Sequence, residues 1–181
     1  RGYAGLGWSP IIEWPVEDVL HTIADAGLPL HEAYTTYGTS RVSCAYCIMS
    51  SQEDLVAATL CADNHDLYVQ MVELEAISSF AFQGHRWLAD VAPHLLSPEL
   101  KEHISHSKHV ASLRQAIEGE LPGHLTFSPG WPTSRPTLED ASLLASVRSR
   151  ISDLIGLDAQ FLTGAAVLER YDELLEIRRL K

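Results

Sequence analysis

The chain has 181 residues, 46% of them hydrophobic, and a formal net charge of −11. This length and composition suffice for one core, or for one domain with a helical extension. The acidic balance argues against direct nucleic-acid binding, because contact with a phosphate backbone needs clustered lysine and arginine. No stretch approaches the roughly 18 consecutive apolar residues of a membrane span, so no membrane partner is expected.

The chain opens at Arg1 and runs to Trp8 without a charged segment followed by an apolar one, which predicts that it carries no signal peptide. Its three cysteines are an odd number and do not make the disulfide framework of a small secreted domain. A reducing cytoplasm is therefore the expected location.

The first predicted helix begins at Pro15, whose missing N–H costs nothing in a first helical turn. Glu17 and Asp18 lie where the positive end of a helix favours carboxylates. Gly27 and Pro29 end the helix. Apolar residues recur at helical spacing between these limits: Val16, Val19, Leu20, Ile23 and Ala24.

Residues 30–50 follow neither the helical nor the strand period and predict a loop. This loop carries Cys44 and Cys47. Ser51, with Asp54 three residues later, resembles a capping box and predicts that a helix begins directly behind the cysteines. A helix N-terminus at this place would lower a thiol pKa and favour a bound anion.

Four more helices are predicted, from Asp66 to about Phe80, from Ser97 to about Ile117, from Thr137 to about Leu154, and from about Gly164 to Leu180. The first of them is expected to pack through the stripe Leu67, Met71 and Leu74, with Tyr68 and Val72 beside it. The second is expected to turn Leu100, Ile104, Val110, Leu113 and Ile117 toward a core. Glu73 and Glu75 are interpreted as part of a solvated face.

Residues 121–136 are rich in proline and glycine and predict a loop or linker. The expected organisation is a helical part with the Cys-x-x-Cys loop over residues 1–120, the linker at 121–136, and a helical pair at 137–181. The predicted fold class is mostly α, with little or no strand.

Cys44 and Cys47 can reach one metal ion without backbone strain, and Cys61 and His65 are the nearest candidates to complete a site. The spacing Cys-x2-Cys-x13-Cys-x3-His is compatible with zinc or with an iron-sulfur cluster. Two alternatives remain open: Cys61 packs as a small buried thiol, or Cys44 and Cys47 form a redox disulfide.

Arg41 is the best single candidate for binding an anion, because a guanidinium beside a helix start suits sulfate, phosphate or nucleotide oxygens. The alternative is that Arg41 pairs with Glu32 or Glu53 and anchors the loop.

His103, His106 and His109 recur every third residue and spread over a helix face, which favours a solvated polar face over a metal site.

Residues 10–47 contain a succession of short motifs: Pro10-Ile11-Ile12-Glu13-Trp14, the acidic helix start Glu17-Asp18, the turn Gly27-Leu28-Pro29, and Ser40-Arg41-Val42-Ser43-Cys44-Ala45-Tyr46-Cys47. This succession resembles the C-terminal part of the phosphoadenosine phosphosulfate reductase-like family, in the PP-loop ATP pyrophosphatase (adenine nucleotide alpha hydrolase) superfamily. The likeness continues more loosely through Asp66-Leu67-Tyr68 and Glu73-Leu74-Glu75. The family's Ser-Gly-Gly-x-Asp-Ser nucleotide loop is missing from this sequence.

The resemblance implies that this chain is the helical C-terminal half of a PP-loop α/β protein, whose N-terminal half lies in the same or another chain. It implies a role in sulfur metabolism, on an adenine nucleotide or an adenylated sulfur donor, by sulfonucleotide reduction or ATP-dependent sulfur transfer. Ser40 and Arg41 would face the substrate, and Cys44 and Cys47 would supply thiol or cluster chemistry. The competing hypothesis is a noncatalytic, zinc-stapled helical module that mediates protein contacts.

Overall fold

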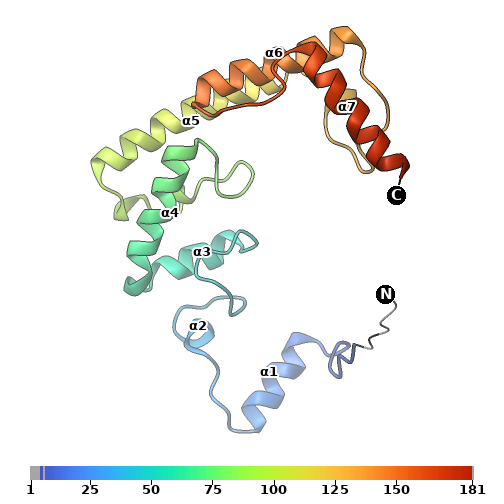
Figure 1. Cartoon of the computed structure of the whole chain (residues 1–181). Helices are drawn as coiled ribbons and strands as arrows, with labels where there is room; N and C mark the ends of the chain where they lie inside the picture. Colours follow the sequence, from blue (N-terminus) through green and yellow to red (C-terminus); the bar gives the residue numbers. More distant parts are fainter. Residues whose placement is uncertain (1–4, 6, 181) are drawn as a thin grey trace. The chain divides into compact units, whose positions relative to one another are not determined.

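The computed structural model describes residue 5 and residues 7–180. Arg1–Ala4, on which the signal-peptide prediction partly rests, lie outside the described residues, as do Leu6 and Lys181. The described part divides into two units, residues 1–64 and residues 65–181. It is mostly helical, as predicted, and a single isolated bridge between Gln83 and Arg86 is the one strand-like pairing among the described residues (Figure 1).

The first unit holds α1 (Val16–Asp25), α2 (Glu32–Thr35), α3 (Gln52–Thr59) and the short 3-10 helix Ala62–Asn64. Pro15 is the residue that precedes α1, and Gly27 follows its end with a φ of 67°, a left-handed conformation that glycine adopts without strain. The predicted helix is therefore confirmed at both ends.

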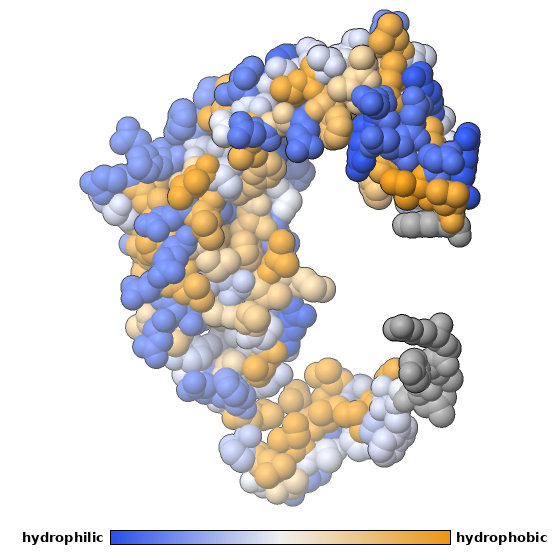
Figure 2. All heavy atoms as spheres, in the orientation of Figure 1, coloured by the Kyte–Doolittle hydropathy of each residue, from blue (hydrophilic) through white to orange (hydrophobic). Residues whose placement is uncertain are grey.

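The apolar face of α1 is not covered within the described residues, because none of the ten residues of this helix is buried. Val16 is 67% exposed, and Ile11, Ile12 and Trp14 in the preceding turn are exposed as well. Figure 2 shows hydrophobic residues gathered over this helix and the turn before it.

The second unit contains α4 (His65–Ser78), α5 (Pro98–Glu118), α6 (Leu138–Ile155) and α7 (Gly164–Arg179), with 3-10 helices at Leu88–Asp90, Pro93–Leu95 and Gly123–Leu125. Helix α4 packs against α5, α5 against α6, and α6 against α7. The side chains of Thr137 and Asp140 form a capping box at the start of α6, at the predicted first residue.

The buried face of α4 differs from the predicted one. Leu67 and Leu74 are exposed, whereas the buried residues are Tyr68, Val72 and Glu75, which share a face at i, i+4 and i+7. Leu113 of α5 is likewise exposed, contrary to the prediction, while Leu100, Ile104 and Val110 are buried as expected.

Glu75 is 4% exposed, so its interpretation as a solvated residue was wrong. Its carboxylate accepts hydrogen bonds from the backbone N–H groups of Phe82, Leu88 and Ala89 at 2.7 to 2.9 Å. The Tyr68 hydroxyl accepts from Ala92 N and donates to the Leu88 carbonyl. Two side chains of α4 thus supply the buried polar contacts that hold the loop between α4 and α5.

Residues 121–136, the predicted linker, contain no regular element beyond the turn Gly123–Leu125, but they pack on their neighbours. Leu125 is buried, and Trp131 stacks edge-on against Tyr171 with ring centroids 5.3 Å apart. Arg178 of α7 donates to the carbonyl of Pro132 at 2.7 Å. The segment belongs to the second unit, and the boundary between the two units falls at 64/65.

Among the described residues, no helix is both long enough and apolar enough to cross a membrane.

Candidate functional site

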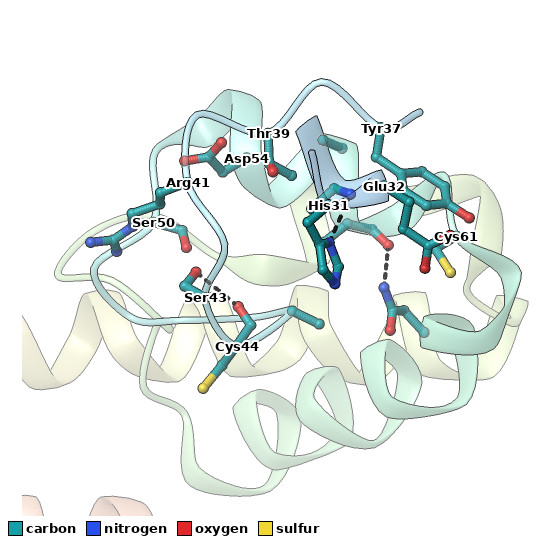
Figure 3. A pocket seen from close by; sticks show the side chains of 15 residues that line it. His31, Glu32, Tyr37, Thr39, Arg41, Ser43, Cys44, Ser50, Asp54 and Cys61 are labelled. Atoms are coloured by element: carbon teal, nitrogen blue, oxygen red, sulfur yellow. Dashed lines mark hydrogen bonds between the residues drawn. The ribbon is translucent and has the colours of Figure 1, made fainter. Parts of the chain in front are cut away.

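A cavity of about 210 Å³ in the first unit brings the sequence-predicted binding residues together. Its lining comes from α2, from the cysteine-bearing loop and from α3. Figure 3 shows Arg41, Ser43 and Ser50 on one side of this cavity and Glu32, Tyr37 and Cys61 on the other.

Asp54 fixes the backbone of the Ser-Arg motif beside this cavity. Its carboxylate accepts hydrogen bonds from Ser40 N at 2.6 Å and from Ser40 Oγ at 2.7 Å. Asp54 lies in the first turn of α3, where its own N–H donates to the Ser51 side chain. The hydrogen bonds from Ser40, and then those from Ser51, hold the pKa of the buried Asp54 below its usual range, so the carboxylate stays charged.

Arg41 is exposed and follows directly on this anchored residue. Among the described residues it forms no ion pair, and neither Glu32 nor Glu53 lies within salt-bridge distance of it. Its Nη2 lies 3.9 Å from the sulfur of Cys47, which also accepts from Met49 N at 3.5 Å. The geometry therefore favours a guanidinium that is available to a ligand over one that anchors the loop.

Cys61 belongs to the opposite side of the cavity and contacts Tyr37. Their side-chain hydrogen bond is the main cause of a raised pKa at the Tyr37 hydroxyl, and the neighbouring carboxylates of Glu32 and Asp63 add to it. Cys44 is exposed, and in Figure 3 its sulfur points away from the side that Cys61 occupies.

Cys44, Cys47 and Cys61 belong to the first unit, and His65 begins α4 in the second. Within the described part of the chain, no group of three or more histidine, cysteine, aspartate or glutamate side chains is placed to hold a metal ion. The metal and the cluster stay predictions from the sequence.

Thr39 is a cavity residue that the sequence analysis missed. Its Oγ1 is buried and has no hydrogen-bond partner among the described residues, and the side chain lines the cavity one residue before the Ser-Arg motif. A buried hydroxyl without a partner is costly, which suits a place that a polar ligand or water completes. The dense serine and threonine of residues 35–43 was the available signal, but it indicated only a loop.

The histidines of α5 follow the prediction, because His103, His106 and His109 are all exposed.

Comparison of the chain with protein-family models, with curated proteins and with solved structures found no match.

Proposed function

We propose that this chain is the C-terminal part of a phosphoadenosine phosphosulfate reductase-like protein that acts on an adenine nucleotide or an adenylated sulfur donor. The reaction would be sulfonucleotide reduction or ATP-dependent sulfur transfer. A PP-loop half, in the same or another chain, would grip the nucleotide.

The observation that carries this proposal is the anchoring of Ser40 by Asp54. Two short hydrogen bonds to a charged acceptor fix the backbone of the Ser-Arg motif, so Arg41 begins from a defined position at the N-terminal end of α3. A guanidinium presents paired N–H donors to two oxygens of a phosphate or sulfate group. The motif that carries the family resemblance therefore has the geometry of an oxyanion contact.

The cavity supplies further groups that suit a nucleotide or sulfonucleotide. Thr39 offers a hydroxyl without a partner, and His31 and Asn64 offer further polar atoms. The thiols of Cys44 and Cys47 lie within a few residues of Arg41, and Arg41 Nη2 lies 3.9 Å from the sulfur of Cys47.

The uncovered face of α1 supports the proposed partner. A ten-residue helix is marginal by itself in water, and in proteins such a helix is stabilised by burying its apolar face. This one buries no residue within the described chain, and the exposed turn before it extends the apolar surface. Both belong to the segment that resembles the family, which suits contact with a PP-loop half.

Isothermal titration of an adenine nucleotide tests the proposal, with the chain joined to the proposed PP-loop half. Arg41→Ala is expected to weaken binding about tenfold or more, the effect of losing one charge-assisted contact. Arg86→Ala is the matched control, because Arg86 is also exposed but belongs to the second unit. Equal affinities of the Arg41→Ala variant and the unsubstituted protein would overturn the proposed role.

A further inference from the structure

A second cavity, of about 150 Å³, lies within the unit of residues 65–181, between the loop after α4 and the middle of α5. Donor groups dominate its lining, and no aspartate or glutamate belongs to it. The residues that can donate a hydrogen bond into it include Gly84, His85, Lys108, Ser112, Arg114 and Gln115. In a chain of net charge −11, a cavity lined by two cations and no carboxylate is unusual.

Arg114 is the buried cation of this cavity. It is 8% exposed, and its Nε has no hydrogen-bond partner among the residues the structure describes. A buried guanidinium N–H without an acceptor costs free energy, and in native proteins such a group commonly meets an ion or a water. The cavity next to Arg114 has ample room for either.

Other contacts hold the guanidinium in place. Its carbon lies 3.6 Å from the centre of the Phe80 ring, and Nη1 lies 3.5 Å from the carboxylate of Glu118. Stacking fixes the plane of the group, and Glu118 is not part of the cavity lining. Arg114 Nε is thus a buried donor of the guanidinium that has no acceptor among the described residues.

Lys108 is the second cation. Its Nζ lies 2.6 Å from Asp90 and 5.8 Å from the centre of the Trp87 ring. Asp90 is mostly exposed and does not line the cavity, so water screens this pair. A compact ammonium has three donors, and the single bond to Asp90 leaves others for a ligand.

We infer that this cavity binds a small tetrahedral oxyanion, phosphate or sulfate, through the Arg114 guanidinium and Lys108 Nζ, with His85 and Ser112 as further donors. The anion is either free or the terminal group of a phosphate ester. The site is separate from Arg41, and the inference does not rest on the function proposed above.

The test is a titration of the full chain with inorganic phosphate, followed by the nitrogen-15 NMR signals of the arginine Nε–H groups. The Arg114→Met variant identifies the Arg114 signal by its absence. We expect that signal to shift saturably at millimolar phosphate, and not in sodium chloride of matched ionic strength. Lys108→Met is expected to weaken binding about tenfold. Arg150→Met is the matched control, because Arg150 pairs with Glu120 away from the cavity.

A shift that does not saturate, or that chloride reproduces, would overturn the inference. An affinity that Lys108→Met leaves unchanged would also overturn the assigned site. If Arg114→Met does not fold, Arg114→Lys keeps the charge and also lacks the Nε–H group, so it identifies the Arg114 signal in the titration of the unsubstituted chain. AMP in a second titration separates the two sources: a matching shift indicates a phosphate ester, and no shift indicates a free anion.

Discussion

The unit of residues 1–64 and the unit of residues 65–181 cover their helices differently. In the second unit, α4 packs against α5, and the two helices bury Tyr68, Val72, Leu100 and Ile104. Helices α6 and α7 pack around a buried cluster that includes Ala141 and Val167. In the first unit, α1 and α2 bury no residue, whereas α3 buries Asp54, Leu55, Ala57, Ala58 and Thr59. Polar contacts organise the candidate site there, above all those between Ser40 and Asp54.

The two units therefore differ in the kind of contact that stabilises them. Apolar burial is the main source of stability in the second unit. The first unit keeps the apolar surface of α1 exposed and has a polar cavity. The predictions below probe that contrast, beginning with the largest expected effect.

Replacement of Glu75 by alanine is expected to destabilise the second unit by about 3 kcal/mol or more. The substitution leaves two buried and one partly buried backbone N–H groups without an acceptor, and each buried one costs roughly 1–3 kcal/mol. Urea denaturation measures the change in the free energy of unfolding. Glu75→Gln is the matched variant, since it keeps one acceptor oxygen and should lose less. A loss of under about 0.5 kcal/mol for Glu75→Ala would show that the loop does not depend on this carboxylate.

The same substitution in both units sharpens the contrast. Val72→Ala is expected to cost about 2 kcal/mol, because Val72 is fully buried and the change removes two methyl groups and leaves a cavity. Val16→Ala is expected to change the free energy of unfolding by less than about 0.5 kcal/mol, because Val16 is exposed. Denaturation of the two variants side by side provides the measurement. Equal losses would mean that α1 is covered in solution.

The pH dependence of the two buried carboxylates is expected to have opposite signs. Burial raises the pKa of Glu75 above its ordinary 4.5, so its contribution to stability is full below that pH and is lost as the pH rises through the folded-state pKa. Hydrogen bonds from Ser40 lower the pKa of Asp54 below its ordinary 3.8, so its contribution is present above that pH and is lost as the pH falls through the folded-state pKa.

Glu75→Gln and Asp54→Asn remove these two dependences. Unfolding free energies of each variant and of the unsubstituted chain, measured across the acid range, give the difference curves. A Glu75 curve that rises with pH would contradict the assignment.

Helix positions could be predicted from the sequence because their ends carry local chemistry. Gly27 ends α1, Ser97 and Pro98 begin α5, and Thr137 with Asp140 begins α6. These signals act within one turn of a helix, so no knowledge of the tertiary structure is needed to interpret them.

The faces of the helices were harder to predict. The hydrophobicity of leucine and the charge of glutamate predict the opposite of what α4 shows, since Leu67 and Leu74 are exposed and Glu75 is buried. The backbone N–H groups that donate to the buried Glu75 carboxylate belong to the loop after α4. No sequence pattern within the helix predicts these contacts.

The candidate site could be predicted only where its residues carry a local signal in the sequence. Ser40 and Arg41 stood out through their place in a motif and before a helix start. The contact between Ser40 and Asp54 spans 14 residues, and the unpartnered hydroxyl of Thr39 depends on the folded loop. Neither has a local signature.

The most direct test of the central claim is a double-mutant cycle of Arg41→Ala and Asp54→Asn, measured as the adenine-nucleotide affinity of the chain joined to the proposed PP-loop half. If Asp54 acts by positioning Arg41, each variant weakens binding and the double variant is little weaker than Arg41→Ala alone. The claim that Asp54 positions Arg41 for the nucleotide would be contradicted if the double variant lost as much binding free energy as the two single variants together. It would also be contradicted if Arg41→Ala bound the nucleotide as tightly as the unsubstituted protein.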